Sequence, residues 1–163
     1  IRTHESAIRI IDKEGPLLNP ADRDHCIQYM VAIPLIFGRL TANDYENNVA
    51  MDPRIDLLRE KIHCIEDSSF TNDYLDPEKR SIANAITIEL NNGEVLEEVL
   101  VEFPIGHKKR RKDGIPLLIE KFKINLNRQY KQEIQERILD LSLDLEKLKQ
   151  TSVNDYVDMY TKE

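Results

Sequence analysis

The stretch from Asn19 to Gly38, NPADRDHCIQYMVAIPLIFG, constrains the fold of this chain more than any other. Asn19 and Pro20 are typical of a helix start, because asparagine caps free amides and proline needs no amide proton there. From Cys26 to Phe37 nearly every residue is apolar. A helix that is apolar on all sides is normally buried on several faces. The stretch therefore predicts a central core helix, which Pro34 kinks or ends in its last turn.

The clearest β-structure signal lies in the second half of the chain. Ile82–Leu90 alternates along its length, and Val95–Phe103 is a second strand-like run, with Asn91-Asn92-Gly93 between the two. Asparagine and glycine tolerate the positive φ angles of a tight turn, so these runs predict a β-hairpin. Ile1–Ile11 is dense enough in apolar residues for a further, buried strand.

Caps and apolar spacing predict the remaining elements. Helices are expected over Thr41–Met51, after Asp52, over Ile115–Leu126, over Gln132–Leu141 and over Val153–Tyr160, and loops over Asp67–Arg80 and His107–Gly114. The expected fold class is α+β, a small antiparallel or mixed sheet with packed helices, followed by a helical C-terminal tail. We expect the α+β domain to comprise residues 1–126 and the helical tail residues 127–163.

Polar side chains crowd the entrance to the central helix. Tyr29 follows His25 by one helical turn and Arg23 precedes both, so a cluster of the three near a helix N-terminus would suit a carboxylate. We predict His25 as a candidate catalytic acid or base, with Arg23 and Tyr29 as substrate-binding residues. The alternative is that His25 is a packed histidine, hydrogen-bonded to a neighbour.

A second candidate site is the basic segment that begins at His107. Gly106 precedes this histidine, and Lys108, Lys109, Arg110, Arg111 and Lys112 follow it. We predict His107 as a second candidate acid or base and Lys108 as a substrate-binding residue, in a loop that attracts an anionic substrate. The alternative is a solvated basic loop, which most runs of charge are.

Composition narrows the classes of partner. The formal net charge of −7 argues against nucleic acid, and the best apolar run, Cys26–Phe37, is too short to cross a bilayer. Cys26 and Cys64 fit neither a disulfide framework nor a metal-binding spacing, so we expect buried free thiols and no metal site.

Three runs resemble the C-terminal half of MmgE/PrpD family proteins: THESAIRIIDKEGPLLNPADRDH at Thr3–His25, its continuation NPADRDHCIQYMVAIPLIFGRL, and FPIGHKKRRKDGIP at Phe103–Pro116. The resemblance extends from Ile1 to near the C-terminus. It implies a fragment of a longer enzyme, with a large helical domain before Ile1 onto which the tail returns. In the family the main catalytic residues lie largely in that missing helical domain and near the inter-domain junction, so this chain alone is expected to be inactive.

The resemblance also implies an activity. The runs favour a cytoplasmic hydro-lyase, mitochondrial in a eukaryote, that removes water from the tricarboxylate 2-methylcitrate in the methylcitrate cycle of propionate catabolism. Such enzymes form homodimers and use no metal or organic cofactor. Two alternatives stay open: another chemistry of the family, cis-aconitate decarboxylation or iminodisuccinate epimerisation, or a non-catalytic packing or dimerisation module.

Overall fold

The structure is a computed structural model that describes residues 1–161. It divides into two compact units, Ile1–Pro104 and Ile105–Glu163. Helices dominate both units and a small mixed sheet lies in the first, so the predicted α+β class is confirmed. Within the described residues, no helix combines the length and the apolar composition needed to cross a membrane.

The sheet of the first unit has four short strands in the order β2-β1-β3-β4. They are β1 (Arg2–Thr3), β2 (Ile65–Glu66), β3 (Asn84–Ile86) and β4 (Val99–Val101). β1 pairs in parallel with β2 and antiparallel with β3, and β3 pairs antiparallel with β4. The N-terminal strand therefore lies in the middle of the sheet, and residues far apart in the sequence meet on either side of it.

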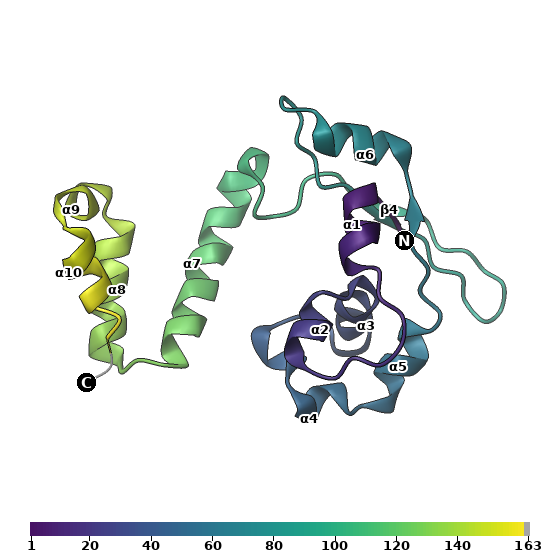
Figure 1. Ribbon diagram of the computed structural model, residues 1–163, viewed down its shortest axis with the longest axis horizontal. Helices are drawn as coiled ribbons and strands as arrows, with labels where there is room; N and C mark the ends of the chain where they lie inside the picture. The colour runs from purple at the N-terminus through teal and green to yellow at the C-terminus, as the bar shows by residue number, and fades with distance from the viewer. Residues whose placement is uncertain (162–163) are drawn as a thin grey trace. The chain divides into compact units, whose positions relative to one another are not determined.

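Helices fill the rest of the first unit. They are α1 (Glu5–Ile11), α2 (Pro20–Asp24), α3 (Ile27–Phe37), the 3₁₀ helix η1 (Ala42–Tyr45), α4 (Asn47–Ala50), α5 (Pro53–Arg59) and α6 (Ser68–Leu75). Figure 1 shows α2, α3, α4 and α5 gathered into one group, with α1 leading from that group to the sheet. The predicted helix start after Asp52 is confirmed, because the Asp52 carboxylate accepts the amide of Arg54 and Pro53 is the first helical residue.

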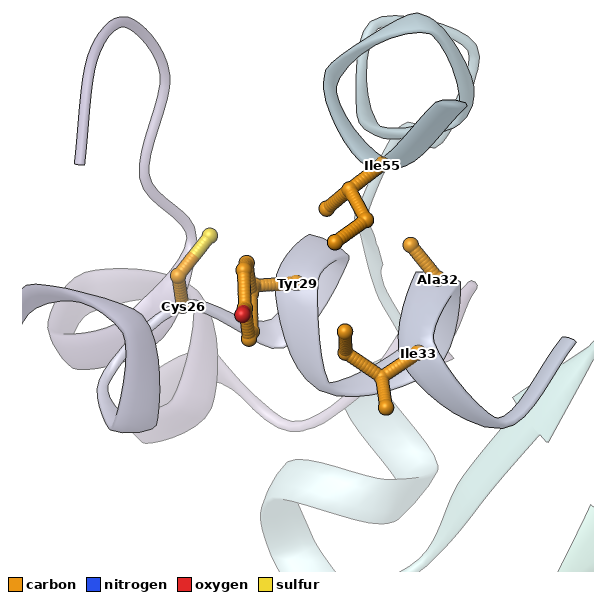
Figure 2. Close-up of a cluster of buried hydrophobic side chains, with 5 residues drawn as sticks. All are labelled: Cys26, Tyr29, Ala32, Ile33 and Ile55. Carbon is orange, nitrogen blue, oxygen red and sulfur yellow. The ribbon is translucent and has the colours of Figure 1, made fainter. Parts of the chain in front are cut away.

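The core of the helical group forms around α3. Cys26, Tyr29, Ala32 and Ile33 are all at most 2% exposed, and Ile55 of α5 is 1% exposed. Figure 2 shows Ile55 pointing from its own helix toward the side chains of α3. The apolar stretch is thus the central core element, as predicted, and burial of its side chains drives the packing of α5 against it.

The predicted single helix from Asn19 onward is two helices. α2 ends at Asp24 with His25 as its C-cap, Cys26 is extended (φ −129°, ψ 109°), and α3 begins at Ile27. Arg23 and Tyr29 are six residues apart, so in one continuous helix they would point to different sides. The break lets both side chains reach the backbone at Asp44 and Tyr45.

The prediction for Ile1–Ile11 is wrong. Only Arg2 and Thr3 form a strand, and α1 begins at Glu5 after the cap residue His4. His4 explains the change, because its Nδ1 accepts the amide proton of Ala7 and caps the helix. The dense apolar residues of this segment therefore belong to a short helix.

The prediction of a loop over Asp67–Arg80 is also wrong. The Asp67 carboxylate accepts the amides of Ser69 and Phe70 and so caps α6. Phe70 is 8% exposed and packs with Ala83, just before β3, and with Ala85 of β3. Tyr74 of the same helix stacks on the His4 ring at 4.3 Å, so tertiary packing as well as the cap stabilises a helix in this mostly polar segment.

The predicted hairpin is confirmed. β3 and β4 pair as Asn84↔Val101, Ala85↔Leu100 and Ile86↔Val99, and Gly93 has φ +84° in the turn. Farther out, Glu89 pairs with Val95, a register that differs by one residue. An extra residue on the returning strand, a β-bulge, accounts for this difference.

The second unit consists of helices. They are η2 (Lys108–Arg110), α7 (Arg111–Asn127), α8 (Gln132–Leu143), α9 (Leu145–Gln150) and α10 (Val153–Asp158). The predicted basic loop over His107–Gly114 is therefore helical for most of its length, since α7 begins at Arg111. The tail helices occur as predicted, and the Ser152 hydroxyl caps α10. The expected boundary between residues 126 and 127 concerns packing in a longer protein and stays a prediction.

Candidate functional site

The first unit contains a cavity of about 500 Å³. It lies where the connection between α1 and α2, the first turn of α3 and the end of α5 approach one another. Its walls are formed by Lys13, Glu14, Gly15, Pro16, Gln28, Asp56, Arg59, Glu60, Ile62 and His63. Both signs of charge occur on these walls, so the cavity can offer donors to a carboxylate and acceptors to a hydroxyl group.

Arg59 is the buried cation of this cavity, at 9% exposure. Its Nη2 donates to the Gly15 carbonyl at 3.0 Å and its Nη1 to the Asp56 carboxylate. Its buried Nε has no acceptor among the described residues, which costs free energy because the lost hydration of that group is not replaced. Lys13 is a second cation, held only loosely at 3.9 Å from Asp22. These two residues are the cations of the wall, and each can donate to a carboxylate.

Gln28 connects the cavity to the two cysteines. Its Nε2 donates to the Asp12 carboxylate, and its Oε1 accepts from the Cys26 thiol at 3.3 Å. Cys64 lies 3.9 Å from the same Nε2, and burial, with Asp12 nearby, raises the pKa of its thiol to about 12. Cys64 is therefore protonated near neutral pH, which makes it a poor nucleophile. Both cysteines are free thiols, as predicted, but Cys26 is buried whereas Cys64 is only partly buried.

Arg23 and Tyr29 lie away from the cavity walls, in the core. Arg23 is 5% exposed and its Nη1 donates to the Tyr45 carbonyl at 2.6 Å. The Tyr29 hydroxyl donates to the Asp44 carbonyl at 2.6 Å, and burial raises its pKa. Both side chains therefore anchor the 3₁₀ turn that follows α3. Their predicted role in substrate binding stays a prediction.

His25 lies beside this pair in sequence but faces outward. Its side chain is 59% exposed, and its Nδ1 is 2.5 Å from the carboxylate of Asp24. Since the helix breaks at this point, His25 and Tyr29 do not share one continuous helical face. The structure thus leaves His25 accessible but separates it from the buried hydroxyl with which it was expected to cluster.

His107 begins the helical segment of the second unit. Its Nδ1 accepts the amide of Lys109 at 3.1 Å and so caps η2, which contains Lys108. Gly106 has no positive φ angle and a Cβ there would meet open space, so neither the backbone conformation nor the packing requires glycine before His107.

The cavity residues were mostly missed by sequence reasoning. Lys13, Gln28, Arg59 and His63 belong to no sequence motif. They come from three separate segments of the chain, and at the bend at Gly15 (φ +80°) the Gly15 carbonyl accepts from Arg59. Within residues 1–161, no group of three or more His, Cys, Asp or Glu side chains is placed to hold a metal ion.

Comparison with known proteins gives a consistent result. The sequence model of the MmgE/PrpD C-terminal domain matches residues 1–147. The chain is 69% identical over 160 residues to the 2-methylcitrate dehydratase of Escherichia coli (strain K12), a match covering 98% of this chain and 33% of that protein. It is 64% identical to that of Cupriavidus necator, with the same two coverages.

A eukaryotic relative is similar over the same region. The mitochondrial 2-methylcitrate dehydratase of Yarrowia lipolytica is 54% identical over 162 residues, covering 99% of this chain and 31% of that protein. The chain therefore spans about a third of the length of the curated relatives it matches.

Proposed function

The chain belongs to the MmgE/PrpD family, and we propose that it forms the C-terminal part of a 2-methylcitrate dehydratase. The full-length enzyme is then a hydro-lyase that converts 2-methylcitrate into 2-methyl-cis-aconitate in propionate catabolism. One observation carries this proposal: the 69% identity, over 98% of this chain, to a protein of that name.

The reaction has clear chemical requirements. Removal of water from a tricarboxylate needs a base for the carbon-bound proton and an acid for the departing hydroxyl. It also needs cations to hold the carboxylates and the charge that develops next to them. This chain supplies part of that set, and we assign the remaining groups to the helical domain that precedes it.

Two histidines are our candidates for proton transfer. The side chain of His25 is exposed, which supports a role in which its imidazole contacts a substrate that also binds the preceding helical domain. The position of His107 beside Lys108, at the start of a run of five cations, supports a role near an anionic substrate. We propose Lys108 as a carboxylate-binding residue.

The cavity supports a further contribution to binding. Arg59 and Lys13 can each donate to a carboxylate, and the Glu60 carboxylate can accept from a hydroxyl group. We propose that this wall faces the substrate in the full-length enzyme.

The assembly and location are also part of the proposal. We propose a homodimer in which residues 127–163 pack on the helical domain. The bacterial relatives suggest a cytoplasmic enzyme, and the name of the Yarrowia lipolytica relative suggests a mitochondrial one in a eukaryote.

The test is an assay of the full-length protein with each substrate in turn. It follows formation of the conjugated alkene from 2-methylcitrate and citrate, release of CO2 from cis-aconitate, and inversion of the stereocentre of iminodisuccinate. We expect turnover of 2-methylcitrate above that of citrate, cis-aconitate or iminodisuccinate, and no turnover by the 163-residue chain alone. A preference for cis-aconitate or iminodisuccinate would assign another chemistry of the family. Normal turnover by both His25→Ala and His107→Ala would indicate that this part of the enzyme is a non-catalytic packing module.

A further inference from the structure

The sheet register gives the position that residues before Ile1 would take if they continued β1. β1 is the central strand, and Arg2 pairs with Ala85 of β3 in antiparallel orientation. In such a pair, one step back along β1 corresponds to one step forward along β3. The residue directly before Ile1 would therefore lie opposite Thr87. The third residue before Ile1 would lie opposite Glu89.

The hydrogen bonds of β1 alternate as this extension requires. Ile1 and Thr3 accept backbone amide protons from the β2 side, from Ile65 and Asp67 respectively. The terminal amino group of Ile1 also donates to the His63 carbonyl on that side, at 2.7 Å. Odd-numbered residues of β1 thus bond toward β2. Even-numbered ones, and the residue directly before Ile1, point toward β3.

The hairpin presents a matching edge. Ile88 accepts from Leu96 and Leu90 donates to Glu94, so both bond across the hairpin. Glu89 lies between them, and its own N–H and C=O therefore point to the opposite edge. Glu89 lies opposite Val95, but within residues 1–161 its own N–H and C=O groups make no hydrogen bond. Unpaired strand edges readily accept another strand.

The two alternations agree in phase. On the hairpin strand, the backbone N–H and C=O groups of Ala85, Thr87 and Glu89 all point toward β1. The same groups of the residues that would lie opposite them all point toward the hairpin. The matched relatives are about three times as long as this chain, and the family model is that of a C-terminal domain, so the full-length protein supplies the chain in question.

We propose that, in the full-length protein, the residues directly before Ile1 continue β1 and dock on the hairpin edge at Thr87–Glu89. The same segment runs parallel to the chain at His63, which lines the cavity. It therefore completes the cavity wall beside Ile62 and His63. Strand register and the length of the matched relatives support this position, whichever reaction the enzyme catalyses.

The first test is hydrogen–deuterium exchange of the unmodified full-length protein, read at single residues. The Leu90 amide is the internal control, because its partner Glu94 lies within the hairpin. We expect the Glu89 amide to exchange at least about tenfold more slowly than in an unstructured peptide, since a strand partner would protect it. Exchange of the Glu89 amide at the unprotected rate would overturn the proposal.

The second test identifies the partner and its register. Glu89→Cys is combined with a cysteine at the third residue before Ile1, in full-length protein whose other cysteines are replaced by alanine. Hydrogen-bonded antiparallel pairs have a Cα–Cα distance of about 5.5 Å, which a disulfide can span. The control places the second cysteine two residues before Ile1, where its side chain points to the other face. We expect linked peptides only from the first pair, and equal or no linkage in both would refute the register.

Discussion

At the scale of single residues, polar groups that are buried near the helix entrance hold the chain's turns. Tyr29 shows this clearly, because it is 2% exposed and its hydroxyl satisfies the carbonyl of Asp44. Tyr29→Phe leaves that carbonyl unpaired, so we expect the free energy of unfolding to fall by about 1–2 kcal/mol. Tyr45→Phe is the matched control, since the Tyr45 hydroxyl makes no hydrogen bond within residues 1–161. Urea denaturation of both variants measures the difference, and equal losses would contradict the role given to Tyr29.

His4 makes stability depend on pH. Burial lowers the pKa of its imidazole, because the charged form loses hydration, and its Nδ1 must stay unprotonated to cap α1. A folded-state pKa below the unfolded value means that the stabilisation is complete above about pH 6.5 and is lost as the pH falls through the folded pKa. We expect His4→Asn, which keeps a capping oxygen, to flatten the decline in denaturation midpoint between pH 7 and pH 5. A variant that declines as steeply as the wild type would show that other groups cause it.

At the scale of elements, the sequence predicted what local patterns encode. The hairpin and the core stretch follow from alternation, turn residues and apolar density, and both occur. The predictions of secondary structure were wrong where contacts between residues far apart in the sequence stabilise the local structure. Phe70 packs a mostly polar segment, which forms a helix, onto Ala83 and Ala85. The break at Cys26 lets Arg23 and Tyr29 bond to one distant turn.

The candidate site was less predictable than the fold for the same reason. His25 and His107 were found by residue type, yet Arg59 enters the cavity through a hydrogen bond to Gly15, 44 residues away. No local pattern encodes such a contact.

The start of α7 depends on a close backbone contact. A Cβ at Gly114 would lie 2.2 Å from the Ile105 carbonyl oxygen, so the segment leading to His107 can pack there only against glycine. We expect Gly114→Ala to destabilise the second unit by about 1–3 kcal/mol, although alanine is the better helix former. Gly106→Ala, where a Cβ meets open space, should leave the midpoint of thermal unfolding almost unchanged. The contact would be unimportant if both variants unfolded at the wild-type temperature.

At the scale of the whole molecule, much apolar surface lies open on the described helices. Val153 of α10 is 78% exposed and Val157, one turn later, is 54% exposed. Scattered apolar residues are ordinary on protein surfaces, but two on one face of an amphipathic helix indicate a packing partner. The tail residues 127–163 are proposed to find that partner in the helical domain of the full-length protein.

Val157→Asp tests this packing, because its effect should depend on chain length. In the 163-residue chain Val157 is largely solvated, so we expect a change in unfolding free energy within about 0.5 kcal/mol. In the full-length protein the carboxylate would be buried in an apolar contact, and we expect a loss of about 2 kcal/mol or more. Asp158→Asn, at an exposed position on the side of α10 away from Val153 and Val157, also changes the charge by one unit and should have little effect in either chain. Urea denaturation of the two variants in both chain lengths measures these effects. An equally small effect of Val157→Asp in both lengths would mean that α10 faces solvent in the complete enzyme as well, because burial of a carboxylate in an apolar contact would lower the free energy of unfolding by more than that.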